Sequence, residues 1–157
     1  MIHFVFDLDD TLIIHEKNIS IDYYKMKEDL LLTECLRKCK GKCYIYTNGT
    51  GGHALEVIKR MNIINMFEKI YSRDTIPSMK PYINSFMSVD RDIGNLYPGS
   101  KVVFFFDDLL ENLKTAHQLG WKTFWINPNH KEGYKYSFVD LSFPNIKDCL
   151  IYLESKF

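Results

Sequence analysis

Apolar residues along this chain fall into short, nearly continuous runs separated by longer segments of mixed character. Such runs are shorter than most helices, and a run that is apolar at almost every position is typical of a strand buried on both faces. The pattern predicts five buried strands with the sequences IHFVF (2–6), CYIYT (43–47), KIYS (69–72), KVVFFF (101–106) and KTFWI (122–126).

The segments between these runs carry apolar residues at helical spacing. An apolar residue at every third or fourth position places one stripe of a helix against a core. We expect helices over about residues 21–38, 53–61, 81–93 and 109–119, the last of them stopped by Gly120. A short edge strand within residues 137–143 and a final helix over residues 145–156, opened by Pro144, are expected to complete the chain.

Alternating strands and helices predict an α/β fold, because parallel neighbouring strands need long crossover connections and helices supply them. The expected architecture is a doubly wound, Rossmann-like parallel sheet sandwiched by helices. The chain has 157 residues, of which 46% are hydrophobic, which is material for one core and too little for two. We therefore expect a single domain over residues 1–157.

Overall charge gives no indication of a particular partner. The 20 basic residues balance 20 acidic ones, so no global field favours nucleic acid, although KGK (40–42) and KEGYK (131–135) offer local phosphate contacts. The longest purely apolar stretch, residues 102–106, is far shorter than the roughly 20 residues that cross a bilayer. The first residues do not resemble a secretory signal. We expect a cytoplasmic protein without a membrane partner.

Four cysteines, Cys35, Cys39, Cys43 and Cys149, suit a reducing compartment better than a disulfide framework. Three of them follow one another at four-residue intervals in CLRKCKGKC. A zinc site usually has closer pairs and a fourth ligand. We therefore expect the first two cysteines to share a helix face and the third to begin a strand, with zinc as the less favoured alternative.

Charged and polar side chains gather where the predicted strands end. They are Asp7, Asp9 and Asp10 after the first strand, Thr47 and Asn48 after the second, Lys80 after the third, and Asp107 and Asp108 after the fourth. In open α/β sheets, ligands bind beyond the carboxyl ends of the strands. Carboxylates crowded there raise one another's pKa unless a cation lies among them, and oxygen ligands without His or Cys favour Mg²⁺.

A phosphate group explains the remaining polar residues. The Thr47 hydroxyl and the Lys80 ammonium are donors suited to the oxygens of a transferring phosphoryl group. Asp7 can attack as a nucleophile and form an aspartyl-phosphate, while Asp9 acts as general acid and base. Gly51 and Gly52 leave backbone N–H groups free near a helix N-terminus, or form a plain flexible turn.

Each of these segments has an ordinary structural alternative. A D-x-D-x-T sequence can cap a helix, T-N-G can be a turn, and a single lysine is usually solvated. Asp107 and Asp108 can cap the following helix. Their common position at strand ends favours the phosphoryl-transfer site.

The segments FDLDDTL, YTNG, MKP and FFDDLLEN resemble the four successive motifs of the haloacid dehalogenase (HAD) superfamily of hydrolases, over nearly the entire chain. The resemblance implies that Asp7 is the nucleophile and Asp9 the acid/base. It implies Mg²⁺ bound by Asp7, the Asp9 backbone carbonyl and Asp108, and phosphate bound by Thr47, Asn48 and Lys80. Asp107 and Asn112 match positions that ligate or organise the metal. An acidic Asp9 disfavours dehalogenation, because a leaving halide needs no proton.

The resemblance also implies a minimal cap. Members with a cap between the first two motifs need more chain than residues 13–42, which hold a loop and about one helix, and the segment between Thr47 and Lys80 is equally short. An open site admits a small phosphorylated substrate such as a nucleotide, and also a phosphoprotein or a nucleic-acid end, and a second subunit of a homo-oligomer can cover it. Tyr23, Tyr24 and Met26 either contact a base or pack on the body. A non-catalytic binding module with this fold is the third reading.

Overall fold

The computed structural model describes residues 1–15 and 22–156. Its centre is a six-stranded sheet in the order β3-β2-β1-β4-β5-β6, in which all neighbouring strands are parallel. The strands are β1 (Ile2–Phe6), β2 (Gly41–Tyr46), β3 (Lys69–Tyr71), β4 (Val102–Asp107), β5 (Lys122–Ile126) and β6 (Leu141–Phe143). The predicted α/β, doubly wound, Rossmann-like sheet is confirmed.

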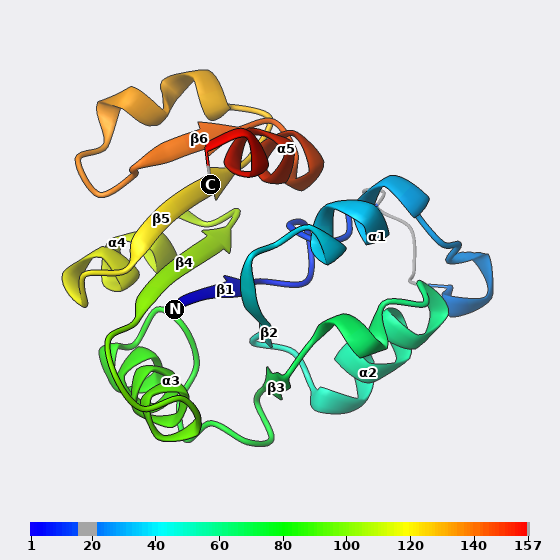
Figure 1. The fold of residues 1–157 in the computed structure, drawn as a ribbon, viewed down its shortest axis with the longest axis horizontal. Helices are drawn as coiled ribbons and strands as arrows, with labels where there is room; N and C mark the ends of the chain where they lie inside the picture. Colours follow the sequence, from blue (N-terminus) through cyan, green and yellow to red (C-terminus); the bar gives the residue numbers. More distant parts are fainter. Residues whose placement is uncertain (16–21, 157) are drawn as a thin grey trace.

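Helices cover both faces of the sheet (Figure 1). The alternation of side chains along β1 shows how: Phe4 and Phe6 belong to one buried cluster and Val5 to the other. The first cluster includes residues of α1 (Leu30–Arg37), α2 (Gly51–Arg60) and α5 (Ile146–Lys156), and the second those of α3 (Ile83–Leu96) and α4 (Leu110–Gln118). Burial on both faces accounts for the continuous apolar runs of the central strands.

The strand order changes sides at β1: β2 and β3 lie on one side of it, and β4, β5 and β6 lie on the other. From β1 the chain builds outward through β2 and β3, then returns to place β4 on the other side of β1. Phe6 pairs with Phe106, so the residues that follow, Asp7 and Asp107, leave the sheet side by side. This is the switch point at which doubly wound sheets bind ligands.

The helix predicted over residues 21–38 is wrong in extent. Among the described residues of this segment, a short 3₁₀ turn, η1 (Tyr23–Lys25), precedes the eight-residue helix α1. Asp22 and Asp29 explain the difference, because each side chain accepts a hydrogen bond from a backbone N–H two or three residues later. Aspartate favours such caps over helix interiors, so each starts a new turn.

The remaining boundaries differ by a few residues from the prediction. Helix α2 begins at Gly51 because Thr50 caps it, accepting from the His53 N–H. The predicted edge strand shortens to β6, and a 3₁₀ segment that was not predicted, η3 (His130–Lys135), precedes it. Within the described residues, every helix is too short or too polar to cross a bilayer.

Candidate active site

Three carboxylates, an ammonium and a hydroxyl meet at the β1/β4 switch point. Oxygen atoms of Asp7, Asp107 and Asp108 all lie within 4.8 Å of one another. Lys80 Nζ lies 3.1 Å from Asp7 Oδ1 and 2.9 Å from Asp107 Oδ2. Thr11 Oγ1 donates to Asp7 Oδ2 at 3.0 Å, and it lies 3.4 Å from Asp108 Oδ1. Residues from three separate segments, after β1, after β3 and at the end of β4, therefore converge on one volume.

Lys80 is buried, with only 1% of its side chain exposed. Besides the two carboxylates, its ammonium donates to the Tyr46 backbone carbonyl at 2.8 Å and lies over the rings of Tyr46 and Phe105. Burial acts to lower the pKa of this group, but Asp107 and Asp7 outweigh it and raise the pKa above its usual value. Lys80 is therefore a fixed positive charge at the site.

The two neighbouring aspartates of β4 differ in what they bind. Asp107 is fully buried, and both its oxygens accept: Oδ1 from the Leu109 N–H at 2.9 Å, and Oδ2 from Lys80 and from Asn112 Nδ2 at 3.1 Å. Asp108 is partly exposed, and its Oδ1 lies 3.4 Å from Thr11 Oγ1. This geometry makes Asp107 and Asn112 positioning residues for Lys80 and leaves Asp108 free to face a ligand.

The residues after β2 use their side chains in different ways. Thr47 is buried, and its Oγ1 accepts from the Gly49 N–H at 3.0 Å, so its own O–H remains a donor. Asn48 donates from Nδ2 to the Lys80 carbonyl and accepts on Oδ1 from the Lys80 N–H, at 3.0 and 2.8 Å. The Asn48 side chain therefore holds the Lys80 backbone in place, and only its backbone can reach a phosphate.

Burial and neighbouring negative charge raise the pKa values of two carboxylates of the cluster, Asp7 and Asp108. Burial raises the pKa of Asp7 to about 6, with Asp107 adding to the effect and Lys80 opposing it. Burial, the hydrogen bond to Asp7 and the charge of Asp107 raise the pKa of Asp108 to about 8. A divalent cation relieves both effects, and an all-oxygen donor set suits Mg²⁺. The carboxylates of Asp7, Asp107 and Asp108 thus form an acidic cluster of a kind that fits a magnesium ion.

The raised pKa values of Asp7 and Asp108 predict a pH-dependent response to magnesium. A carboxylate whose pKa is raised on folding stabilises the fold below the unfolded value of about 4 and loses that contribution as the pH rises through its folded pKa. The metal-free protein should therefore lose stability between about pH 4 and pH 8, the window set by Asp7 and Asp108. Added Mg²⁺ should raise the melting temperature more at pH 8 than at pH 5. Calorimetric melting with and without Mg²⁺ checks this, and an equal shift at both pH values contradicts it.

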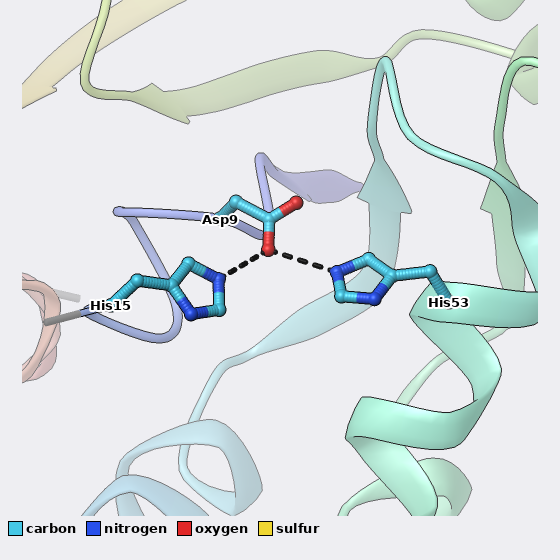
Figure 2. A group of neighbouring side chains, drawn as sticks. All are labelled: Asp9, His15 and His53. Atoms are coloured by element: carbon cyan, nitrogen blue, oxygen red, sulfur yellow. Dashed lines mark hydrogen bonds and ion pairs between the residues drawn. The ribbon is translucent and has the colours of Figure 1, made fainter. Parts of the chain in front are cut away.

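Asp9 lies between two imidazole rings, as Figure 2 shows. His15 Nε2 lies 2.6 Å and His53 Nε2 3.0 Å from the same oxygen, Asp9 Oδ1. His53 Nδ1 in turn lies 2.6 Å from the Tyr23 hydroxyl. Burial acts to raise the pKa of Asp9, but the hydrogen bonds from His53 and His15 outweigh it and hold the pKa below its ordinary value. The Asp9 carboxylate is oriented by two basic groups.

Sequence reasoning missed His15 and His53. His53 follows the Gly-Gly pair at the start of α2, and His15 lies six residues after Asp9, and neither spacing is a known signal. The turn that carries His15 back depends on Asp10, which adopts a positive φ of 62° and accepts from the His15 N–H. Such a conformation is open to aspartate but is not readable from its neighbours.

Tyr23 and Tyr24, which the sequence offered as contacts for a base or as packing residues, have different surroundings in the structure. Tyr23 is partly buried and bonded to His53, whereas Tyr24 is 85% exposed, with the Arg60 guanidinium over its ring. The expectation of free N–H groups at the start of α2 is wrong for Gly51, whose N–H donates to Asp74 Oδ2 at 2.7 Å.

The four cysteines are free thiols. The expectation that Cys35 and Cys39 share a helix face is wrong, because α1 ends at Arg37 and Cys39 lies beyond it. Among the described residues, the only groups of three metal-ligating side chains are Asp7 with Asp107 and Asp108, and Asp9 with His15 and His53. Neither group includes a cysteine.

The structure is that of a doubly wound α/β protein with an acidic cluster at its switch point. Its fold is that of the HAD superfamily, as solved structures show. No protein-family model and no curated protein matches the sequence.

Three solved structures illustrate the likeness. D,D-heptose 1.7-bisphosphate phosphatase from B. bronchiseptica, complexed with magnesium and phosphate, is 13% identical, with a TM-score of 0.69 and 100% of both chains covered. L-2-haloacid dehalogenase from Xanthobacter autotrophicus is 14% identical, with a TM-score of 0.63, 86% of this chain covered and 64% of the dehalogenase. A HAD-superfamily hydrolase from Ehrlichia chaffeensis is 21% identical, with a TM-score of 0.59, 82% of this chain covered and 61% of the other.

Proposed function

We propose that this chain is a Mg²⁺-dependent phosphomonoester hydrolase that acts through a phospho-aspartate at Asp7. The observation that carries the proposal is the switch-point cluster, in which Asp7 shares one volume with a buried ammonium, a hydroxyl and a second, less satisfied carboxylate. The likeness over the full length of both chains to a phosphatase that binds magnesium and phosphate supports it.

Asp7 and Asp9 divide the chemistry between them. An Asp7 oxygen attacks phosphorus, the bond from phosphorus to the ester oxygen breaks, and Asp9 gives that oxygen its proton. Water then attacks the phosphorus of the aspartyl-phosphate, Asp9 takes the proton of the water, and inorganic phosphate leaves with the Asp7 carboxylate restored. Magnesium, when bound, neutralises charge on the phosphate oxygens.

The fixed donors act on the phosphoryl oxygens. Lys80 Nζ lies 3.1 Å from Asp7 Oδ1, and the buried Thr47 side chain, which follows β2, keeps its O–H free to donate because its Oγ1 already accepts from the Gly49 N–H. Preorganised donors stabilise charge that develops in a transition state without reorganising during the reaction. Three further side chains position Lys80 and do not touch the substrate. Asp107 accepts from the Lys80 ammonium, Asn112 donates to Asp107, and Asn48 donates to the Lys80 backbone carbonyl.

Halide displacement is the second candidate, because dehalogenases share this fold. An acidic residue at position 9 favours the phosphatase. A carboxyl group there can give a proton to an alkoxide leaving group and take one from water, whereas a leaving halide takes no proton.

We also propose that residues 13–42 are a minimal cap on a single domain. Before β2 begins at Gly41, the helical elements of their described part are η1 and α1, and α1 packs against α5 of the body. We favour a small phosphorylated metabolite such as a nucleotide as the substrate. An open site also admits a phosphoprotein or a nucleic-acid end, which is the alternative, and leaves room for a second subunit.

Replacing Asp9 by asparagine should slow turnover by about 10²-fold or more, the usual effect of losing a general acid/base. Asp10→Asn is the matched control, because Asp10 is exposed and asparagine also tolerates its positive φ. We expect that control to keep turnover within about twofold of the parent, since surface substitutions rarely matter. Equal rates for the two variants in aryl phosphate hydrolysis contradict the assignment of Asp9.

A substrate panel tests the proposed function as a whole. Aryl phosphate, nucleoside monophosphates, sugar phosphates, phosphopeptides, phosphorylated oligonucleotides and a 2-haloacid are each incubated with the protein and Mg²⁺. We expect phosphate release, lost on chelation with EDTA and greatest for a small metabolite. Halide release alone favours the dehalogenase, and inactivity on every compound favours a binding module.

A further inference from the structure

A second group of ligating atoms lies beside the carboxylate cluster. Asp9 Oδ1, His15 Nε2 and His53 Nε2 lie within 4.8 Å of one another. His53 is 44 positions from Asp9 in the sequence, so the tertiary fold is what brings it there. Both imidazoles point their Nε2 atoms at one oxygen (Figure 2). We propose that Asp9, His15 and His53 bind a transition-metal ion such as Zn²⁺, and that the bound ion blocks proton transfer by Asp9.

The donor atoms distinguish this group from the switch-point cluster. Two imidazoles and one carboxylate suit Zn²⁺, Cu²⁺, Ni²⁺ or Fe²⁺, whereas the all-carboxylate group suits Mg²⁺. The two groups are therefore selective for different ions. A cell or buffer that contains both ions can fill both sites at once.

The spacing of the three atoms fits a small ion. Ligand atoms around a tetrahedral Zn²⁺ with bonds of about 2.0–2.1 Å stand about 3.3 Å apart. The distances from Asp9 Oδ1 are 2.6 Å to His15 and 3.0 Å to His53. Each imidazole thus needs to move less than about 1 Å away from Asp9 Oδ1, and the two Nε2 atoms lie within 4.8 Å of each other. Side-chain exposures of 23% for His15, 15% for His53 and 35% for Asp9 leave an entry path and a fourth position for water.

Tyr23 supplies the outer contact that imidazole ligands of metals usually have. Its hydroxyl lies 2.6 Å from His53 Nδ1. Without an ion, Nε2–H donates to the Asp9 carboxylate, and Nδ1 accepts from the hydroxyl. On binding, the proton moves from Nε2 to Nδ1, which then donates to the Tyr23 oxygen, while the Nε2 lone pair binds the ion. One hydroxyl serves both tautomers.

The local backbone holds His15 over Asp9. Asp9 and Ile13 form an isolated β-bridge, and the N–H groups of Thr11, Leu12 and Ile13 donate to the Leu8 carbonyl. This tight turn returns the chain toward its own strand end. The ligand from the loop is therefore positioned before an ion arrives, which lowers the ordering cost of binding.

Binding of Zn²⁺ alone tests the site. Calorimetric titration of the full chain in excess Mg²⁺ should give one Zn²⁺ per chain. We expect His15→Ala and His53→Ala each to weaken binding by about 100-fold or more, and Tyr23→Phe by about 10-fold, the usual effect of losing an outer partner. His117→Ala, on the exposed face of α4, should bind as the parent does. Equal affinity in all four variants overturns the site.

Cobalt substitution and a cysteine variant exclude the other ligands. With Co²⁺ in place of Zn²⁺, visible absorption without a sulfur-to-cobalt charge-transfer band is expected. A charge-transfer band, or binding lost in Cys39→Ser, places the ion on the thiols instead and overturns the proposal. His15→Ala lies on a loop, so its circular dichroism should match the parent even if His53→Ala unfolds.

The inhibition rests on the proposed phosphatase function, whereas the binding does not. Zn²⁺ added at saturating Mg²⁺ should lower aryl phosphate turnover, and the His15→Ala variant should need at least about 100-fold more Zn²⁺ for the same fractional loss. Zinc binding that requires the histidines in a protein inactive on every substrate supports the site and refutes the phosphatase. Turnover insensitive to bound Zn²⁺ overturns the blocking role.

Discussion

The Asp7→Asn protein should fold, bind less Mg²⁺ and hydrolyse aryl phosphate at least about 10⁴-fold more slowly than the parent, as expected when a covalent nucleophile is removed. Asparagine has nearly the shape of aspartate, and its Oδ1 can still accept from Lys80, which bonds to the Asp7 carboxylate at 3.1 Å. The loss is therefore one of chemistry and not of structure. Steady-state rates and thermal melting of the same samples measure both.

Asp148→Asn is the matched control for this result. Asp148 is exposed in the first turn of α5, which follows the edge strand β6, two strands away from β4 in the sheet. The same change of charge and shape there should leave the rate within about twofold of the parent, as for most surface substitutions. A residual rate in Asp7→Asn within about tenfold of the parent contradicts a covalent role for Asp7.

The Lys80→Met protein should lose both activity and stability. The methionine keeps the apolar length of the side chain but leaves Asp7 and Asp107 without their common cation. Removing one partner of a buried ion pair costs about 3–5 kcal/mol, because the remaining charge is uncompensated. For a chain of this size we expect the melting temperature to fall by about 6 °C or more. Thermal melting at neutral pH checks the fall.

A double variant separates the two losses. Adding Asp107→Asn to Lys80→Met removes one of the buried charges that the single variant leaves unpaired. Stability should then recover in part, whereas turnover should stay low, because the donor to the phosphoryl group is still absent. Recovery of turnover in the double variant would mean that Lys80 serves the fold alone.

The central sheet and most of the site were predictable because their signals are local and strong. Strands such as KVVFFF are apolar at every position after the lysine, and burial on both faces by α-helices is the reason. Once the strands are parallel, their carboxyl ends lie at one end of the sheet, and the pairing of β1 with β4 then brings Asp7 beside Asp107, where the loop after β3 places Lys80.

The parts that sequence did not predict depend on turns and on the pairing of distant residues. The helix expected over residues 21–38 divides because Asp22 and Asp29 bond to nearby N–H groups, and helical spacing of apolar residues does not register such bonds. His53 meets Asp9 only through the packing of α2 beside the β1 loop, across 44 positions of sequence. The different roles of Asp107 and Asp108 likewise depend on tertiary structure, because Lys80 bonds to Asp107 and leaves Asp108 to face a ligand.

Chemical trapping of the intermediate tests the central claim most directly. The protein is mixed with Mg²⁺ and the aryl phosphate that it hydrolyses fastest, and borohydride is added during turnover to reduce any acyl phosphate to an alcohol. Peptide mass spectrometry should then find homoserine at position 7, only with both Mg²⁺ and substrate present. An unmodified Asp7 in a protein that is turning over, or homoserine at another aspartate, contradicts the mechanism.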